Sequence, residues 1–390
     1  MTCNICKNKN IKTLNYFGEI PRSFDFKKKK IIKKYKFVLN KCSQCSVIQL
    51  KKNGKNHSFI PKLKWIKNNE PDDHLDELIL YIKKKLREKK KVLLISNFDE
   101  KIYESLKSKN SKNLKILDSK KHLKISIKNP NQFLIQNSIL KKKYDKNTSN
   151  LGKFDIIVSC RMLEHTYNLN SFIKNLETFL EPNGSFIFEI PDSQKSLKQG
   201  DVSMLWEEHS IYFTKKSFIR AFQVLGYNIL SCKRYPYPQE DALVFEINKF
   251  KKEKMVIKKI TKIDNKLGSV FVKKCKNKKK KLITFLKNKI DKNKKIAIFG
   301  AGHKSIVYFH ANKLTPYIDY IFDDNKKKKN LFFPGTNLKI KPSLTIIKNK
   351  IDICFLSLSI TKEKIIIDKL RKFNNKIEFY SISPDSKYAF

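Results

Sequence analysis

The chain has 390 residues, enough for two or three domains, and its formal net charge at pH 7 is +49. Lysine supplies 79 of the 85 basic residues and arginine only six, and the lysines are spread along the whole chain. Nucleic-acid readers depend on arginine forks interleaved with aromatic rings, so this pattern argues against nucleic acid as a partner and indicates compositional drift in an AT-rich genome.

The sequence also argues against membranes and secretion. Residues 1–20 lack the charged start and apolar core of a signal peptide, and the longest apolar runs are too short to span a bilayer. Four of the eight cysteines have metal-site spacing and four are single, which does not suit a disulfide framework. We therefore expect a cytoplasmic, reducing location and no membrane partner.

Two Cys-x-x-Cys pairs begin the chain, Cys3 with Cys6 and Cys42 with Cys45. Paired thiolates on two tight turns suit tetrahedral zinc, and the alternative is four free thiols in a reduced protein. No His, Asp or Glu completes a site with an open position, so the predicted zinc is structural. It would hold together a zinc-binding module over residues 1–60.

The run from Glu70 to Lys91 predicts one helix. Acidic residues crowd its start and basic residues its end, as the helix dipole prefers, and Pro71 lies in the first turn. His74 lies in that acidic turn, where we expect a capping or exposed residue rather than a catalytic one.

An α/β domain is predicted over residues 70–250. Lys91–Ser96 reads as a strand, a helix begins at Glu100, and Leu114–Asp118 reads as the next strand. The turn that contains Ser96 and Asn97 is the expected place for a nucleotide-type cofactor to meet backbone N–H groups. Asp118 is placed to accept hydrogen bonds from ribose hydroxyls, and a helix-capping role suits it equally. A weaker pattern indicates a strand at Gln132–Gln136.

The clearest unit lies between Phe154 and Ile190. An apolar strand at Phe154–Cys160 is followed by a helix over residues 170–180 and a turn at Glu181–Gly184. A second strand, Ser185–Ile190, ends at Pro191. This β-α-β order predicts parallel strands in a sheet covered on both faces.

Ligands of such sheets gather at the carboxyl ends of the strands. That edge should therefore carry residues 160–165 and 191–209. Cys160, Arg161 and Glu164 are the candidate cofactor-binding residues of the first segment.

The remaining elements complete a doubly wound domain and add a second one. A helix over Lys215–Leu225 and strands at Asn228–Lys233 and Ala242–Lys249 finish the first domain. Residues 251–293 read as a basic helical connector whose charges face solvent. Residues 294–390 read as a smaller Rossmann-like domain, whose first strand runs into the Gly300-Ala-Gly302 turn.

The order of these parts resembles the zinc-containing sugar C-methyltransferases. Likeness is found in Phe17-Gly-Glu-Ile-Pro21, in the segment from Cys42 to Leu50, and in FDIIVSCRMLEH and LEPNGSFIFEIP of the middle domain. It continues in GAGHKS at Gly300 and in FFPGTNLKI from Phe332, and so covers nearly the whole chain. The resemblance implies a class I methyltransferase sheet flanked by a zinc module and a Rossmann-like C-terminal domain.

The resemblance also implies a mechanism. These enzymes use S-adenosylmethionine and methylate a carbon beside a ketone in nucleotide-linked keto-deoxysugars. The family's base maps onto His209, with Glu208 orienting or charge-tuning it, and an imidazole has a suitable pKa for this step. Tyr212 is a candidate hydroxyl of the substrate pocket. The family commonly has Tyr where this chain has Trp206, which keeps an aromatic wall without the hydroxyl.

Two other hypotheses stay open. The Ser96–Glu100 turn contains no glycine, although the family's cofactor turn has a glycine-rich run, so a binding or assembly protein that has lost the cofactor is the main alternative. A weaker alternative is an enzyme that binds a dinucleotide at the GAGHKS turn.

Overall fold

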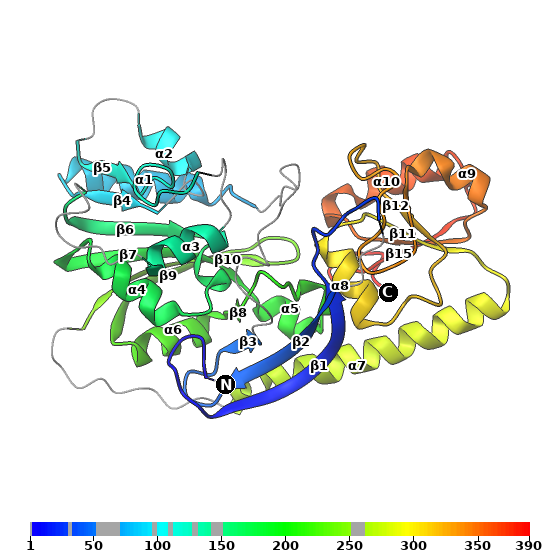
Figure 1. Cartoon of the computed structure of the whole chain (residues 1–390), viewed down its shortest axis with the longest axis horizontal. Coiled ribbons are helices and arrows are strands. Elements are labelled where there is room, and N and C mark those ends of the chain that lie inside the picture. Colours follow the sequence, from blue (N-terminus) through cyan, green and yellow to red (C-terminus); the bar gives the residue numbers. More distant parts are fainter. Residues whose placement is uncertain are drawn as a thin grey trace.

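The computed structural model describes residues 2–29, 33–51, 71–95, 100–107, 112–126, 132–141, 151–250 and 262–390. In these residues the strands form three sheets (Figure 1). None of the helices in the same residues combines the length and the apolar character that a bilayer crossing needs.

The first sheet joins the N-terminus to a segment more than 150 residues later. Its order is β1-β2-β3-β8, and each neighbouring pair is antiparallel. Three of its strands come from the predicted zinc module, and the fourth is a two-residue strand just after His209. The bounds are β1 (Ile11–Pro21), β2 (Lys34–Cys42), β3 (Ile48–Leu50) and β8 (Ile211–Tyr212).

The central sheet is doubly wound, as the sequence predicts. Its order is β5-β4-β6-β7-β10-β9, with β5, β4, β6 and β7 parallel and β10 antiparallel to both of its neighbours. Apolar clusters on both faces bury it against helices. The strands are β4 (Val92–Leu94), β5 (Leu114–Ile116), β6 (Phe154–Cys160), β7 (Leu180–Asp192), β9 (Tyr227–Tyr235) and β10 (Asp241–Lys249).

Helices cover the central sheet and the segment after β7. Helix α1 and the predicted helix from Glu100 are confirmed, and α6 is held at its start by a capping box between Thr214 and Ser217. The bounds are α1 (Leu75–Arg87), α2 (Glu100–Leu106), α3 (Gln132–Lys141), α4 (Leu169–Glu177), α5 (Gln194–Gln199) and α6 (Lys215–Val224), with short 3₁₀ turns η3 (Leu163–His165) and η4 (Val202–Met204).

Two local predictions are wrong. Gln132–Gln136 is the start of helix α3, because Ile135 and Ile139 recur at helical spacing and both are buried. The predicted turn at Glu181–Gly184 is a bulge within β7, whose pairing with β6 jumps from Leu180 to Ser185. The strand then continues one residue past Pro191.

The long helix α7 (Lys262–Asp291) leads to the third sheet. This sheet is entirely parallel, in the order β13-β12-β11-β14-β15. Its elements are β11 (Ile296–Phe299), α8 (His303–Ala311), β12 (Tyr320–Phe322), β13 (Ile340–Lys341), η5 (Ser343–Thr345), α9 (Ile346–Asn349), β14 (Ile353–Leu356), α10 (Ile360–Arg371) and β15 (Glu378–Ser381).

One apolar cluster joins the N-terminal sheet to α7 and the C-terminal sheet. Phe17 of β1 packs on Phe271 of α7 with ring centroids 5.8 Å apart, and the same cluster includes Ile298 and Val307. Gly268 lets α7 lie close to β1, because a Cβ at this position would lie 2.6 Å from Cδ1 of Leu14. The N-terminal sheet and α7 therefore share a core, and α7 runs alongside β1 (Figure 1).

The turn after β11 gives a test of this packing. Gly300 has φ +101° and an added Cβ would lie 2.3 Å from the carbonyl oxygen of Ser357, whereas a Cβ at Gly302 meets no atom within 4 Å. We predict that Gly300→Ala lowers the free energy of unfolding by about 1–3 kcal/mol. Gly302→Ala is the matched control and should be nearly neutral in urea denaturation. Equal stability of the two variants would contradict the geometry of this turn.

Candidate functional site

The segment that follows β7 lies between the central and N-terminal sheets. At its start, the Ser193 N–H donates to the carbonyl of Phe213 at 2.8 Å. At its end, Tyr212 and Ile211 pair with Ile48 and Gln49 of β3. Both ends of the segment are therefore fixed, and its middle contains Trp206 to His209.

His209 lies in a group of four rings, which we call the ring cluster: His165, Trp206, His209 and His303. Its ring centroid is 4.7 Å from that of His165, nearly perpendicular, and 4.8 Å from that of Trp206. Among the described residues its Nε2 atom is enclosed and has no hydrogen-bond partner. Burial lowers the pKa of His209 to about 3, so the imidazole is neutral at physiological pH.

The C-terminal sheet contributes to the ring cluster through His303. This residue begins α8, and its ring stacks on Trp206 with centroids 4.9 Å apart and planes 25° apart. Burial first, then the charges of Lys304 and His209, lower the pKa of His303 to about 3. Burial and the neighbouring His209 also hold the pKa of His165 well below its usual value. The neutral form of all three imidazoles is therefore favoured, with His165 buried and His209 and His303 partly buried.

Ser23 of the N-terminal module holds Trp206 and Glu207 in place. Its backbone N–H and its hydroxyl both donate to Oε1 of Glu207, at 2.6 and 2.8 Å, and its Oγ accepts the indole N–H of Trp206 at 2.9 Å. Tyr212 adds a further contact, since its hydroxyl accepts the Trp206 backbone N–H at 3.0 Å. The Tyr212 hydroxyl therefore fixes the segment.

Glu164 and Glu208 are both buried beside the ring cluster. Glu164 follows β6, and its carbonyl accepts the backbone N–H of Ser210 at 2.7 Å. One carboxylate oxygen of Glu164 lies 3.7 Å from Nε2 of His165. Potential ligand atoms of Glu164, His165 and His209 lie within 4.8 Å of one another, so this set could also hold a metal ion.

The other candidate cofactor residues are less closely grouped. Cys160 is buried at the end of β6. Arg161 contacts Glu189, with its Nε 3.6 Å from Oε2, and donates to the carbonyl of Pro71. Asp118 caps the turn after β5 by accepting the Lys121 N–H at its Oδ1. Ser96 and Asn97 lie outside the described residues.

The prediction for His74 needs a correction. The residue stands at the N-cap position of α1, but its side chain makes no capping bond and is buried. Its Nε2 lies 3.1 Å from Oε1 of Glu189, and its Nδ1 lies 3.0 Å from the hydroxyl of Tyr237. Because Glu189 is a buried acid of β7 that needs a polar partner, the pair explains why His74 points inward.

The four N-terminal cysteines converge. The Sγ atoms of Cys3 and Cys45 lie 3.6 Å apart, as do those of Cys6 and Cys42, and all four lie within 4.8 Å of one another. Four thiolates around tetrahedral zinc, with bonds of about 2.3 Å, would stand about 3.8 Å apart. The donor set and its spacing therefore fit a zinc ion.

The GAGHKS turn already uses its backbone donors within the chain. The N–H groups of Gly300, Ala301 and Gly302 donate to the Phe322 carbonyl, to Asp323 and to Ser305, at 2.8, 2.9 and 3.0 Å. A dinucleotide phosphate would need these same donors. This geometry gives no support to a dinucleotide site here.

Two family models match the chain. Residues 74–232 match a methyltransferase domain, and residues 258–380 match the C-methyltransferase C-terminal domain. With the sheet order above, these matches establish a class I methyltransferase fold and a methyltransferase domain followed by a C-methyltransferase C-terminal domain. No curated protein matches the chain.

Among solved structures, similarity is found to S-adenosylmethionine-dependent methyltransferases. One from Clostridium acetobutylicum is 13% identical, with a TM-score of 0.30, over 45% of this chain and 95% of that protein. One from Leishmania major is 15% identical, with a TM-score of 0.30, over 45% and 74%. LepI in complex with S-adenosylmethionine is 8% identical, with a TM-score of 0.27, over 44% of this chain and 41% of LepI.

Glu207 gives a pH test of the site. Burial raises its pKa to about 7, so between pH 4.5 and 7 the folded state binds a proton that the unfolded state has released. This contribution therefore falls as pH rises through that window, by up to about 3 kcal/mol. Urea unfolding of the wild type and of Glu207→Gln at pH 5 and pH 7.5 should show the wild type losing stability relative to the variant. A constant difference between the two proteins would contradict the raised pKa.

Proposed function

We propose that this methyltransferase transfers a methyl group from S-adenosylmethionine to a carbon beside a carbonyl group, with His209 as the general base. The acceptor class we propose is a nucleotide-linked keto-deoxysugar or a similar carbonyl compound. The observation that carries the proposal is the enclosed, neutral imidazole of His209, whose Nε2 has no hydrogen-bond partner among the described residues. The match to the C-methyltransferase C-terminal domain supports carbon as the acceptor atom.

In the proposed reaction, His209 transfers the proton and the neighbouring residues hold it in position. Neutral His209 takes a proton from the acceptor carbon, and that carbon forms its new bond to the methyl group as the bond from methyl to sulfur breaks. Bound S-adenosylmethionine supplies the electrophilic methyl group and its own leaving group. Buried Glu208 stabilises the imidazolium that forms, while the Ser23 contacts keep the segment in place.

The described part of the chain offers positions for the methyl donor. The carboxyl ends of parallel strands β4 and β6 meet at one edge of the central sheet, where ligands of such folds bind. Asp118 follows β5 at the same edge and offers a carboxylate to a ribose hydroxyl. Cys160 and Glu164 lie beside that edge. We assign the Ser96–Asn97 turn to the amino-acid end of the cofactor on its place in the sequence.

We predict that His209→Ala abolishes methyl incorporation into nucleotide-linked keto-sugars but leaves S-adenosylmethionine affinity, measured by calorimetry, within about threefold. A rate loss of about 10³-fold or more is expected because the variant lacks the proton acceptor. Unchanged turnover would remove His209 from the mechanism. If the wild type fails to bind S-adenosylmethionine at millimolar concentration, the alternative of a binding or assembly protein is correct.

We further propose that Cys3, Cys6, Cys42 and Cys45 hold one structural zinc. Elemental analysis should find about one zinc per chain, and Cys42→Ser should lose it and lower the melting temperature. Cys232→Ser is the matched control, because this cysteine is single and half-buried, and it should keep the metal. A zinc equivalent that survives in Cys42→Ser would point to Glu164, His165 and His209 and would contradict a free base there.

A further inference from the structure

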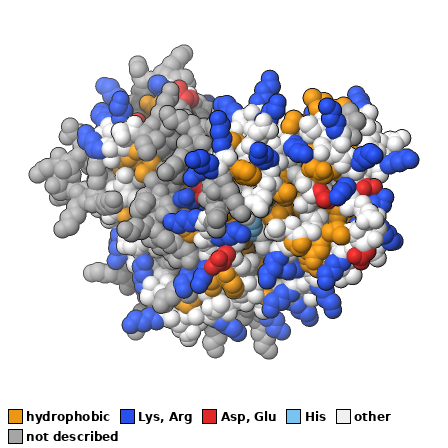
Figure 2. Space-filling view, turned by 45° about the vertical axis from the view of Figure 1, so that its right-hand side comes forward, with side chains coloured by type: hydrophobic (Ala, Val, Ile, Leu, Met, Phe, Trp, Pro, Cys, Tyr) orange, Lys and Arg blue, Asp and Glu red, His pale blue; other side chains and the backbone are white. Residues whose placement is uncertain are grey.

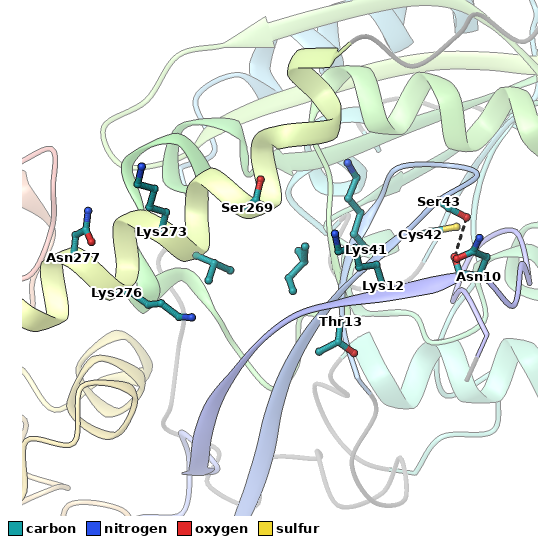
Figure 3. A pocket seen from close by; sticks show the side chains of 12 residues that line it. Asn10, Lys12, Thr13, Lys41, Cys42, Ser43, Ser269, Lys273, Lys276 and Asn277 are labelled. Atoms are coloured by element: carbon teal, nitrogen blue, oxygen red, sulfur yellow. Dashed lines mark hydrogen bonds between the residues drawn. The ribbon is translucent and has the colours of Figure 1, made fainter.

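The surface that the described residues form singles out no second polar site. Lys and Arg side chains are scattered over the face shown in Figure 2, with acidic groups between some of them. The groove between β1 and α7 (Figure 3) is lined by exposed lysines such as Lys12 and Lys273, and its Ser269 hydroxyl donates to the carbonyl of Lys266 at 2.8 Å. One imidazole of the ring cluster, that of His303, has no role in the reaction proposed above.

Helix α8 fixes His303 beside the segment that contains His209. The helix packs against β1 and η4, and Val307 is fully buried in the apolar cluster that it shares with the N-terminal sheet. At the start of the helix the Gly302 N–H donates to Oγ of Ser305 at 3.0 Å. His303 is the first helical residue, so its backbone is held in place without any contribution from its own ring.

The ring of His303 is open to a bound molecule. Neither of its nitrogens forms a hydrogen bond with any residue that the structure describes, and the residue is only partly buried. Its ring centroid lies 4.9 Å from that of Trp206, and the His209 centroid lies 4.8 Å from the same ring. The two imidazoles therefore lie close enough together to act on one small molecule.

His303 can donate a hydrogen bond in its neutral form. Burial, followed by the charges of Lys304 and His209, lowers its pKa to about 3. The N-terminus of α8 acts in the same direction, because the helix dipole places positive charge there. A neutral imidazole carries one N–H group. The donor is therefore present throughout the physiological pH range.

Other aromatic N–H and O–H groups in this region already have partners. The indole N–H of Trp206 donates at 2.9 Å to a serine of the N-terminal module. The Tyr212 hydroxyl accepts the backbone N–H of Trp206 and lies 3.5 Å from the carbonyl of the same residue. The Tyr167 hydroxyl donates to the carbonyl of Glu207 at 3.5 Å. These groups hold the segment in place, whereas the N–H of His303 is available to a ligand.

Proton removal by His209 creates a need for such a donor. When a carbon beside a carbonyl group loses its proton, negative charge develops on the carbonyl oxygen, and a preorganised donor at that oxygen lowers the barrier. We propose that the imidazole N–H of His303 binds the carbonyl oxygen of the acceptor and stabilises the enolate. This inference rests on the proposed function and extends it by assigning a catalytic residue to the C-terminal domain.

The proposed step balances. Nε2 of His209 takes the proton, the electron pair of the broken C–H bond forms the C=C bond of the enolate, and the carbonyl π pair moves to the oxygen that His303 contacts. The enolate carbon then bonds to the methyl group, the carbonyl forms again, and the electron pair of the methyl–sulfur bond stays on sulfur. His303 keeps its proton throughout.

Hydrogen exchange at the acceptor carbon in D₂O isolates the enolate step. S-adenosylhomocysteine, which has no methyl group to transfer, fills the donor site, and the probes are the uridine and thymidine diphosphate derivatives of 4-keto-6-deoxyglucose. We expect His303→Phe, which keeps a ring against Trp206, to exchange about 10²–10³-fold more slowly than the wild type, as the loss of one oxyanion donor does. Tyr308→Phe is the matched control, since it removes one hydroxyl from α8 outside the ring cluster, and it should exchange at the wild-type rate.

A second pair of variants separates the donor from the ring. His303→Gln and His303→Leu both lack the ring, but only His303→Gln retains an N–H donor. We expect His303→Gln to exchange about tenfold or more faster than His303→Leu. Urea unfolding and S-adenosylmethionine calorimetry of each variant exclude a folding defect or a loss of cofactor as the cause.

Two results would overturn the role of His303 alone. These are wild-type exchange in His303→Phe while His209→Ala has lost it, and equal rates in His303→Gln and His303→Leu. A wild type that neither methylates nor exchanges these probes, or that exchanges no faster than His209→Ala, would overturn the catalytic proposal for this acceptor class together with the role of His303. The two failures are therefore distinguishable.

Discussion

The pairing of β8 with β3 is the constraint on which the candidate site depends. Two residues, Ile211 and Tyr212, carry the end of the segment after β7 into the N-terminal sheet, and the Leu50 N–H adds a bond to the carbonyl of Ser210 at 3.0 Å. The backbone of His209 is thereby fixed only two residues before the sheet begins. The N-terminal module looks separate in the sequence, but in the structure it forms one side of the candidate site.

Burial gives this site its chemical character. His165, His209 and His303 are held neutral for the same reason that the pKa of Glu207 is raised, because a charge is costly where water is excluded. A neutral imidazole can accept a proton, and in the mechanism that we propose its basicity increases when buried Glu208 and a bound acceptor pair with its charged form. The ring cluster combines these requirements in one place.

The strands and helices could be predicted from the regular spacing of apolar residues in the sequence. The pairing of segments that are far apart in the sequence could not. The strand at Phe154–Cys160 and the helix from Lys215 follow from local apolar spacing, and the convergence of the four N-terminal cysteines follows from their paired spacing. No local sequence pattern predicts the two-residue strand β8. None predicts the hydrogen bond between Ser23 and Glu207, because these residues are 184 positions apart. The sequence did not predict His303 as a site residue, because the GAGHKS turn that contains it resembles a phosphate-binding turn. In the structure the backbone N–H groups of this turn donate to other residues of the chain.

The N-terminal sheet combines strands that are far apart in the sequence, and this has a consequence for biosynthesis. All four cysteines and strands β1 to β3 are made before residue 51, but β8 begins at Ile211, and 160 residues lie between the end of β3 and this point. At a translation rate of about 5–20 residues per second, the outer edge of β3 waits for its partner for roughly 10–30 s. An unpaired edge can recruit strands from other chains. The nascent polypeptide therefore carries an unpaired strand edge during this interval, and a ribosome-associated chaperone that shields this edge would lower the risk of aggregation.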